Sequence, residues 1–256
     1  MNIREDAAKY YDIQGFPIDD VDFYKSLVPS PSARVLELGC GTGRVLIPLA
    51  EVCGFIHGID SSEAMLEICS TKLESARLPA GRAKVTLGDI TNLELEDQFD
   101  LIIAPFRVMQ TLETDAEVLG MMDVITRCLA PGGSAILNTF FPNRGPDEMR
   151  RSWCSQEENL TGESILEDGS RFVRSDRRPR LQSDPLVLFP ELIYRTYSPS
   201  GDLVDEAILK IAMRCWYPAE LEKLVTDNGF KTVAKWGGYH GEPWAQGPEL
   251  VIQFAR

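Results

Sequence analysis

The sequence predicts an α/β fold, an open and mostly parallel sheet that carries an antiparallel β insertion before its last helix. Short apolar runs alternate with helical patterns from residue 33 to residue 140. A glycine-rich turn, Glu37 to Gly43, joins the first apolar run to the first helical one. From Leu160 to Trp216 the helical period is lost, and strand-like runs separated by turn signals replace it.

The glycine turn follows the apolar run 33–36 and precedes the amphipathic run 45–50. Its glycines at 39, 41 and 43 let the backbone turn sharply and approach a ligand closely. The helix that follows offers unpaired N–H groups and its positive dipole end to that ligand. The spacing departs from the dinucleotide fingerprint, because Arg44 and Leu46 stand where its third glycine belongs. Arg44 also excludes a phosphate loop, which needs Gly-Lys-Ser/Thr.

The turn resembles motif I of the class I methyltransferases that use S-adenosylmethionine (SAM), written E/D-x-G-x-G-x-G. This resemblance implies a seven-stranded, Rossmann-like methyltransferase sheet. It also implies SAM as the cofactor, released as S-adenosyl-L-homocysteine (SAH). The cofactor-binding residues implied in this segment are Glu37, Gly39, Cys40, Gly41 and Gly43.

A second strand, residues 55–60, ends in an acid 17 positions after Gly43. Asp60 therefore lies near the offset at which a carboxylate meets ribose hydroxyls in nucleotide-binding βαβ units. Ser61 or Ser62 then caps a helix. Residues 60–66 resemble the methyltransferase pattern D-x-S-x-x-M-L, in which the methionine, here Met65, packs beside the adenine. Plain core packing is an equal alternative for Met65.

Three further strands complete the first half of the chain. The strand 84–88 ends at Asp89 and Ile90, where the resemblance implies that the acid accepts from the adenine amino group and the next N–H meets the ring. The strand 99–104 ends at Ala104, which the resemblance also places at the cofactor. A helix over 116–130 precedes the Leu-Ala-Pro-Gly-Gly turn 129–133 and the strand 134–139, as in the family. The resemblance covers residues 33–140.

The N-terminal residues 7–12, Ala-Ala-Lys-Tyr-Tyr-Asp, resemble an A-x-x-Y-D element that caps the cofactor site in many relatives. The tyrosine before the aspartate, here Tyr11, is implied to reach the SAM carboxylate. The alternative is an N-terminal helix anchored by one aromatic side chain.

The chain divides into three parts: a cap and SAM-binding core over 1–144, a β-rich insertion over 145–216, and a final helix with two strands over 217–256. Strands are expected in the insertion at 162–166, 171–174, 186–197 and 203–216. A helix should begin near Pro218 and end before Asn228-Gly229, followed by strands at 230–236 and 249–255.

The insertion resembles the one carried by glycine-, sarcosine- and amino-sugar-modifying methyltransferases, where it covers the active site and can mediate dimerisation. It is therefore expected to form a platform over the carboxyl ends of the main strands. A homodimer through the insertion is a further expectation.

The charge balance favours a small-molecule acceptor over nucleic acid. The net charge is −13, with 26 basic against 39 acidic residues, so a polyanion would be repelled over most of the surface. Residues 171–180 hold five arginines, which either receive an anionic group or form a solvated hairpin flank. The base-modifying DNA methyltransferases carry their own motif after the fourth strand. This chain has Ala-Pro-Phe-Arg there instead, which argues against methylation of nucleobases.

Other features of the sequence restrict the expected location and chemistry. No apolar run reaches the length of a membrane span, and the N-terminus has no secretory signal. The six cysteines form no C-x-x-C pair, which predicts a reduced, cytoplasmic chain without a zinc site or disulfide framework. A catechol-type metal site would need acids after the fourth strand and an Asp-Asn pair after the fifth. The chain has neither at these positions, so no metal is expected.

Methyl transfer from a sulfonium is an in-line displacement, so alignment of nucleophile, methyl group and sulfur supplies most of the acceleration. The candidate catalytic residues are Arg107, Gln110 and His240, and the acceptor atom is nitrogen or oxygen. His57 lies in a buried run and is expected to be structural. The alternatives are a catalytically silent SAM-fold subunit and, less favoured, an NAD-dependent oxidoreductase.

Overall fold

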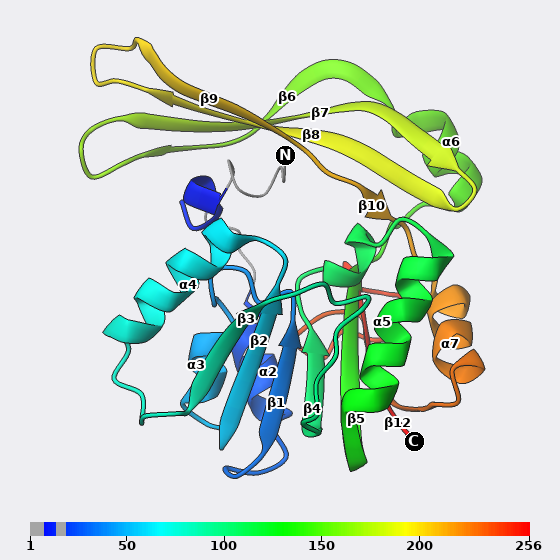
Figure 1. The fold of residues 1–256 in the computed structure, drawn as a ribbon. Helices are drawn as coiled ribbons and strands as arrows, with labels where there is room; N and C mark the ends of the chain where they lie inside the picture. Colours follow the sequence, from blue (N-terminus) through cyan, green and yellow to red (C-terminus); the bar gives the residue numbers. More distant parts are fainter. Residues whose placement is uncertain (1–7, 14–18) are drawn as a thin grey trace.

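The computed structural model, which describes residues 8–13 and 19–256, has the predicted α/β architecture (Figure 1). Seven strands form the main sheet in the order β11-β12-β5-β4-β1-β2-β3. Strands β1 to β5 run parallel to one another, and β12 is antiparallel to both of its neighbours, β5 and β11. The strand bounds are β1 (Arg34–Leu38), β2 (Phe55–Asp60), β3 (Ala83–Leu87), β4 (Phe99–Ala104), β5 (Leu129–Phe140), β11 (Lys231–Trp236) and β12 (Glu249–Ala255).

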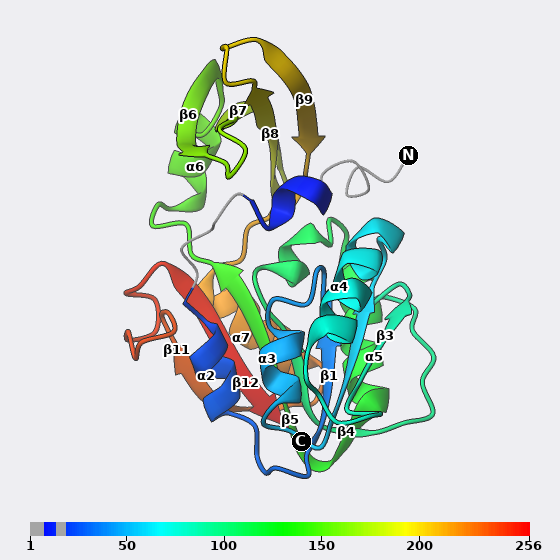
Figure 2. The same ribbon diagram turned by 90° about the vertical axis from the view of Figure 1, so that its left-hand side faces the viewer.

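Helices cover both faces of the main sheet (Figure 2). On one face pack α5 (Asp115–Cys128) and α7 (Pro218–Asp227). On the other face pack α2 (Val21–Ser26), α3 (Leu46–Ala50) and α4 (Glu63–Ser75). Because both faces are covered, β1 and β4 are buried along nearly their whole length, which matches their mostly apolar sequences.

Local sequence signals set the helix starts. Ser62 Oγ accepts a hydrogen bond of 3.3 Å from the Met65 N–H at the start of α4. Thr114 and Glu117 form a capping box at the start of α5. The helix α5 ends at Cys128 and β5 begins at Leu129, so the expected helix over 116–130 is too long at its end. The reason is that Leu129 already pairs with Phe99 of β4, and the register then shifts before pairing resumes.

The insertion forms a second, antiparallel sheet, which confirms the antiparallel β insertion in the expected fold class. It contains β6 (Ser155–Ile165), β7 (Arg171–Ser183), β8 (Leu186–Tyr197), β9 (Leu203–Lys210) and β10 (Met213–Arg214). Strand β8 pairs with β7 along one side and with β9 and β10 along the other. A short helix, α6 (Pro146–Ser152), precedes this sheet and was not expected.

Two strands of the insertion are longer than the expected ranges 162–166 and 171–174. Irregularities in pairing explain the difference, because β7 continues past Pro179 through a register shift between Arg177 and Arg180. The expected strand over 203–216 instead breaks into β9 and β10.

The second sheet lies over the carboxyl ends of the main strands (Figure 1). A helical turn over 8–11 lies against its inner face, where Tyr10 stacks on Tyr194 and Phe172 with ring centroids 5.1 and 5.8 Å apart. The 3-10 helix η1 (Val108–Thr111), which follows β4, contacts β10. The fold thus places the inner face of the second sheet opposite the edge at which parallel sheets bind ligands.

Candidate functional site

The glycine turn between β1 and α3 is anchored to β2. The N–H groups of Gly39 and Cys40 both donate to the carbonyl oxygen of Ile59, at 2.8 and 2.9 Å. Gly39 and Gly41 have φ angles of +74° and +52°, where a side chain is strained. A Cβ at Gly39 would lie 2.5 Å from the side chain of Val108, whereas a Cβ at Gly41 would meet no atom within 4 Å. The turn therefore leaves open space in front of Gly41.

Asp60 lies beside this space at the end of β2 and is 4% exposed. Its Oδ2 accepts from the Gly41 N–H at 2.8 Å, and its Oδ1 accepts from the Ser62 N–H at 3.0 Å. A carboxylate has about four acceptor positions, so two remain for hydroxyl groups of a ligand. Asp60 therefore both shapes the turn and offers acceptors to a diol.

Two neighbouring cavities share this part of the structure. The larger, of about 380 Å³, extends from the glycine turn to the inner face of the second sheet. The smaller, of about 240 Å³, lies between the ends of β1, β2 and β3 and η1. Both are lined by Gly39, Asp60, Val108 and Thr111, so they adjoin.

The larger cavity holds a buried acid, Glu37 of β1. Its Oε2 is buried and has no hydrogen-bond partner among the residues that the structure describes. Burial raises the pKa of Glu37 well above its usual value, and the nearby guanidinium of Arg44 opposes this effect. Arg44 is itself held by Asp20, with Nη2 and Oδ2 3.0 Å apart. A cationic group of a ligand beside Glu37 would restore its charged form.

Tyr11 also lines the larger cavity and packs edge-on against Phe106, with ring centroids 6.4 Å apart. Burial raises the pKa of Tyr11 to about 12, so its hydroxyl is a neutral hydrogen-bond donor at pH 7. The sequence placed Tyr11 at the cofactor, and the structure brings it to the same cavity as Glu37 and Gly41.

The smaller cavity contains the expected adenine-binding pair, Asp89 and Ile90. Asp89 Oδ1 accepts from the N–H and the hydroxyl of Thr91, both at 2.8 Å. Both hydrogen bonds go to Oδ1, so they fix the orientation of the Asp89 carboxylate through that one oxygen. Met65 is 6% exposed and lines the larger cavity, not the smaller one.

Three other candidates in the cofactor region differ in position. Cys40 is buried and lines the larger cavity. Gly43 lines neither of the two cavities, but glycine fits there because its φ is +83° and a Cβ would lie 2.7 Å from Cys69 Sγ. Ala104 lies in the main core and also lines neither cavity, because the chain turns toward the cavity only at Pro105 and Phe106.

Gln110 lines the larger cavity, yet both ends of its side chain are bound to backbone. Its Oε1 accepts from the Phe140 N–H at 2.7 Å, and its Nε2 donates to the carbonyl oxygen of Arg214 at 2.8 Å. Gln110 is 1% exposed. It therefore links η1, β5 and the second sheet, and these contacts favour a positioning role over the expected catalytic one.

Arg107 lines the cavity with a φ of +66°. Its N–H donates to Asn138 Oδ1 at 3.0 Å, and its Nη2 donates to Glu249 Oε1 at 2.5 Å. Asn138 Nδ2 in turn donates to Glu249 Oε2 at 3.0 Å. These three contacts hold the turn at Arg107 in its strained conformation. They also keep the Arg107 guanidinium in an ion pair with Glu249.

The structure does not bring His240 to the site. It lies in the loop between β11 and β12, its side chain is 63% exposed, and it lines neither cavity. The loop follows β11, the edge strand farthest from β1 and β2, so its position gives the expected catalytic role no support. His57 is structural as expected: its Nε2 lies 2.8 Å from Thr86 Oγ1, and burial lowers its pKa to about 4.

Most residues on the acceptor side of the cavity were not predicted from the sequence, although Arg174 belongs to the arginine run 171–180. Side chains on the inner face of the second sheet line this side, among them Thr161, Arg174, Asp176, Leu192 and Tyr194. Strand alternation places residues 172, 174 and 176 on one face of β7, which is the signal that could have found them.

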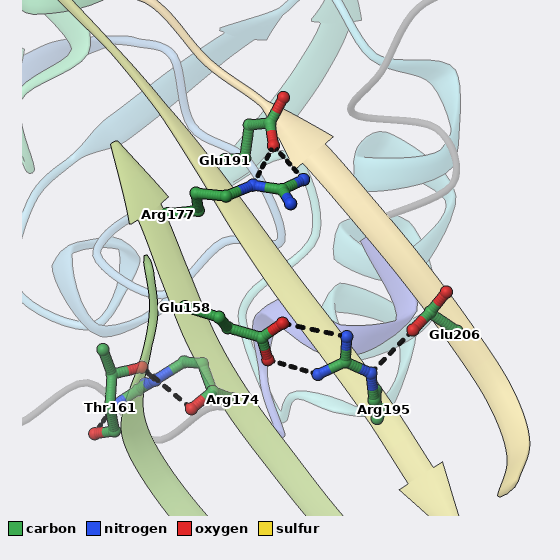
Figure 3. A network of polar contacts seen from close by, with 7 residues as sticks. All are labelled: Glu158, Thr161, Arg174, Arg177, Glu191, Arg195 and Glu206. Carbon is green, nitrogen blue, oxygen red and sulfur yellow. Dashed lines mark hydrogen bonds and ion pairs between the residues drawn. The ribbon is translucent and has the colours of Figure 1, made fainter. Parts of the chain in front are cut away.

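The arginines of 171–180 have partners within the sheet. Arg171 pairs with Glu163 at 3.1 Å. Arg177 Nε donates to Glu191 at 2.8 Å (Figure 3). Arg180 stacks over Phe189 at 3.4 Å. This pattern favours the structural interpretation of the run over an anion site.

The part of the chain that the structure describes has no group of three or more His, Cys, Asp or Glu side chains placed to hold a metal. None of the helices described is long and apolar enough to cross a membrane.

The comparisons with known proteins agree with this geometry. A family profile described as "Methyltransferase domain" matches residues 35–133. A protein of Bacillus subtilis named "Putative methyltransferase YqeM" is 33% identical over 214 residues, which are 75% of this chain and 85% of that protein. The cypemycin N-terminal methyltransferase of a Streptomyces species is 29% identical over 142 residues, 54% of this chain and 56% of that one.

Solved structures resemble the whole chain. The CcbJ methyltransferase from Streptomyces caelestis has a TM-score of 0.79 at 24% identity, with 99% of this chain and 97% of that chain covered. CalS10, described as an amino pentose methyltransferase from Micromonospora echinaspora, has a TM-score of 0.71 at 22% identity, with 100% and 97% covered. At these identities the structures establish a shared fold that includes the second sheet.

Proposed function

Because the chain belongs to the methyltransferase family, we propose that it transfers a methyl group from SAM to nitrogen or oxygen of a small-molecule acceptor bound beneath the second sheet. The observation that carries the proposal is one cavity that joins the glycine turn, Asp60 and Glu37 to the inner face of β7 and β8. The comparisons give no support to the NAD-dependent or the silent alternative.

The residues present fit SAM. Glu37 Oε2 is buried without a described partner, which suits the ammonium group of the methionine portion. Asp60 retains acceptor positions for the ribose hydroxyls, and the open space at Gly41 admits close approach of the ligand. Asp89 lies in the adjoining smaller cavity, which would hold the adenine. SAM supplies an electrophilic methyl group on a cationic sulfur.

The chain contributes mainly alignment. The cavity walls bring an acceptor from the second sheet toward the methyl group, and Gln110 and the Arg107–Glu249 pair hold these walls in position. Phe106, Leu192 and Tyr194 make the acceptor side largely apolar. Positioning of this kind can supply about 7–11 kcal/mol of a bimolecular barrier.

Calorimetric titration with SAM, SAH and NAD tests the cofactor. SAM and SAH should bind and NAD should not, and Asp60→Ala should weaken SAM by about 1.5–3 kcal/mol. A screen with radiolabelled SAM over amines, hydroxy acids and phenols tests the reaction. Binding of SAM with no methyl transfer to any small acceptor would favour the silent subunit.

We also propose a cytoplasmic location and a homodimer through the second sheet. The six cysteines are free thiols and five of them are buried, which suits a reducing compartment. Large apolar side chains on strands of the second sheet are exposed, including Leu160 at 66%, Val204 at 60% and Ile208 at 42%. Analytical ultracentrifugation of the chain and of Val204→Lys tests the dimer.

A further inference from the structure

The acceptor side of the cavity contains one carboxylate, Asp176 of β7, among the described residues of the second sheet that line it. Asp176 pairs across the sheet with Leu192 of β8, and the neighbouring inner-face pair is Arg174 with Tyr194. The carboxylate thus stands in an otherwise mostly apolar wall, on the side of the cavity opposite the glycine turn.

The hydrogen-bonding capacity of Asp176 is not used within the described structure. Its Oδ1 is buried and has no hydrogen-bond partner there, and its Oδ2 lies 3.6 Å from Arg178 Nε. A buried carboxylate oxygen without a donor is unfavourable, and a ligand that donates to it recovers the loss. The terminal torsion of an aspartate is broad, so the carboxylate can turn an oxygen toward such a ligand.

One nearby charge, Arg178, forms an ion pair with Asp176, and the other charges of the sheet are engaged elsewhere. Arg174, on the same face, donates from Nε and Nη2 to Thr161 at 3.2 Å (Figure 3). Arg177 and Arg195 lie on the opposite face, where Arg177 meets Glu191 and Arg195 joins Glu158 to Glu206 (Figure 3). These acids neutralise the outer arginines. Asp176 is the negative group at the acceptor side, and its ion pair with Arg178 through Oδ2 leaves Oδ1 without a described donor.

We propose that Asp176 binds the amino group of the methyl acceptor and so selects a small amine, cationic in solution, over the corresponding alcohol. This inference rests on the proposed function, because it assigns the acceptor chemistry of the same cavity. An ammonium or amine offers the carboxylate N–H donors and an opposite charge, which a hydroxyl group does not.

The charge movement of the reaction agrees with this placement. An acceptor that enters as ammonium first loses one proton to water, which frees the nitrogen lone pair. That pair forms the new N–C bond, the C–S bond breaks, and its electron pair stays on sulfur. Positive charge therefore moves from sulfur to nitrogen, and the methylated ammonium later releases a proton to water. A carboxylate beside the nitrogen stabilises the charge where it develops.

The test uses the full chain saturated with SAH and two probes of one shape, cyclohexylamine and cyclohexanol, titrated by calorimetry. The wild-type protein should bind the amine at least about tenfold more tightly than the alcohol. Asp176→Asn should weaken the amine by about tenfold to a hundredfold, the span for a lost hydrogen bond to a charged group, and leave the alcohol unchanged. Asp176→Glu, which keeps the charge, should retain part of the preference.

Glu163→Gln is the matched control, since it removes one negative charge from the same sheet at an exposed pair with Arg171 and outside the cavity. It should bind both probes as the wild type does. Equal wild-type affinity for amine and alcohol overturns the inference whether or not the variants fold. Unchanged amine binding in folded Asp176→Asn overturns it as well. Failure of SAM and SAH to bind the wild-type chain is a separate result that refutes the proposed function.

Discussion

Gln110 allows a sharp distinction between positioning and catalysis. Replacing it by methionine keeps its approximate volume but removes both polar atoms. The Phe140 N–H and the Arg214 carbonyl, now bound at 2.7 and 2.8 Å, would then be buried without partners. Each unsatisfied group costs about 1–3 kcal/mol, so the free energy of unfolding should fall by about 2–6 kcal/mol. Gln110→Ala should lose more, because it also leaves a cavity.

Urea denaturation measures this loss, and SAM titration with a methyl-transfer assay measures its consequence. We expect SAM affinity to change little in Gln110→Met, since the hydrogen bonds of Gln110 run to β5 and β10, whereas those of Asp60 run to the glycine turn and the start of α4. The acceptor KM should rise, because Arg214 ends β10 of the second sheet. Gln156→Met, at an exposed glutamine of β6, is the control and should stay within about 0.5 kcal/mol. Unchanged stability with a turnover loss above about a hundredfold would show that Gln110 acts on the reacting atoms.

Three further predictions concern the turn and the two histidines. Gly41→Val should fold but lose SAM binding in calorimetry, because its Cβ points into open space that the cofactor needs, and retained affinity would refute this use of the space. His240→Ala should keep turnover within about twofold in the methyl-transfer assay, because an exposed side chain outside the cavities has no acid–base role. His57 has a folded pKa of about 4 against about 6.5 unfolded, so the unfolded chain binds the extra proton and stability is lost as pH falls between these values. In urea titrations across that pH range, the free energy of unfolding should fall less for His57→Gln than for the wild type, by up to about 1.4 kcal/mol per pH unit.

The sequence predicted the cofactor side better than the acceptor side, and the reason is physical. Glu37 to Gly43 and Asp60 belong to one βαβ unit, in which local turn geometry and a parallel register determine where side chains meet. The acceptor side depends on the pairing register of β7 and β8 and on the way a whole sheet packs over another. Strand alternation groups residues 172, 174 and 176 on one face of the run 171–180, but it does not indicate which face turns inward, so Asp176 was missed.

Candidate catalytic residues were harder still, since position along the chain does not reveal how a side chain is used. Gln110 follows β4 at the ligand-binding edge, as predicted, but its amide is consumed by two backbone groups. From the sequence, His240 could also lie at this edge, because it follows a strand, β11. The strand order places its loop beyond β12 and away from β1 and β2, where the glycine turn and Asp60 lie.

The N-terminal turn joins the two sides of the site. Asp205 of β9 accepts from Lys9 Nζ at 2.6 Å and from the Tyr10 hydroxyl, which attaches the turn to the second sheet. Asp12 accepts from Thr42 Oγ1 at 2.9 Å and pairs with Lys72 Nζ at 2.7 Å, which attaches the same turn to the glycine turn and α4. Tyr11 lies between these anchors and lines the cavity. Because its neighbours bind different parts of the fold, Tyr11 is held from both the cofactor and the acceptor side of the cavity.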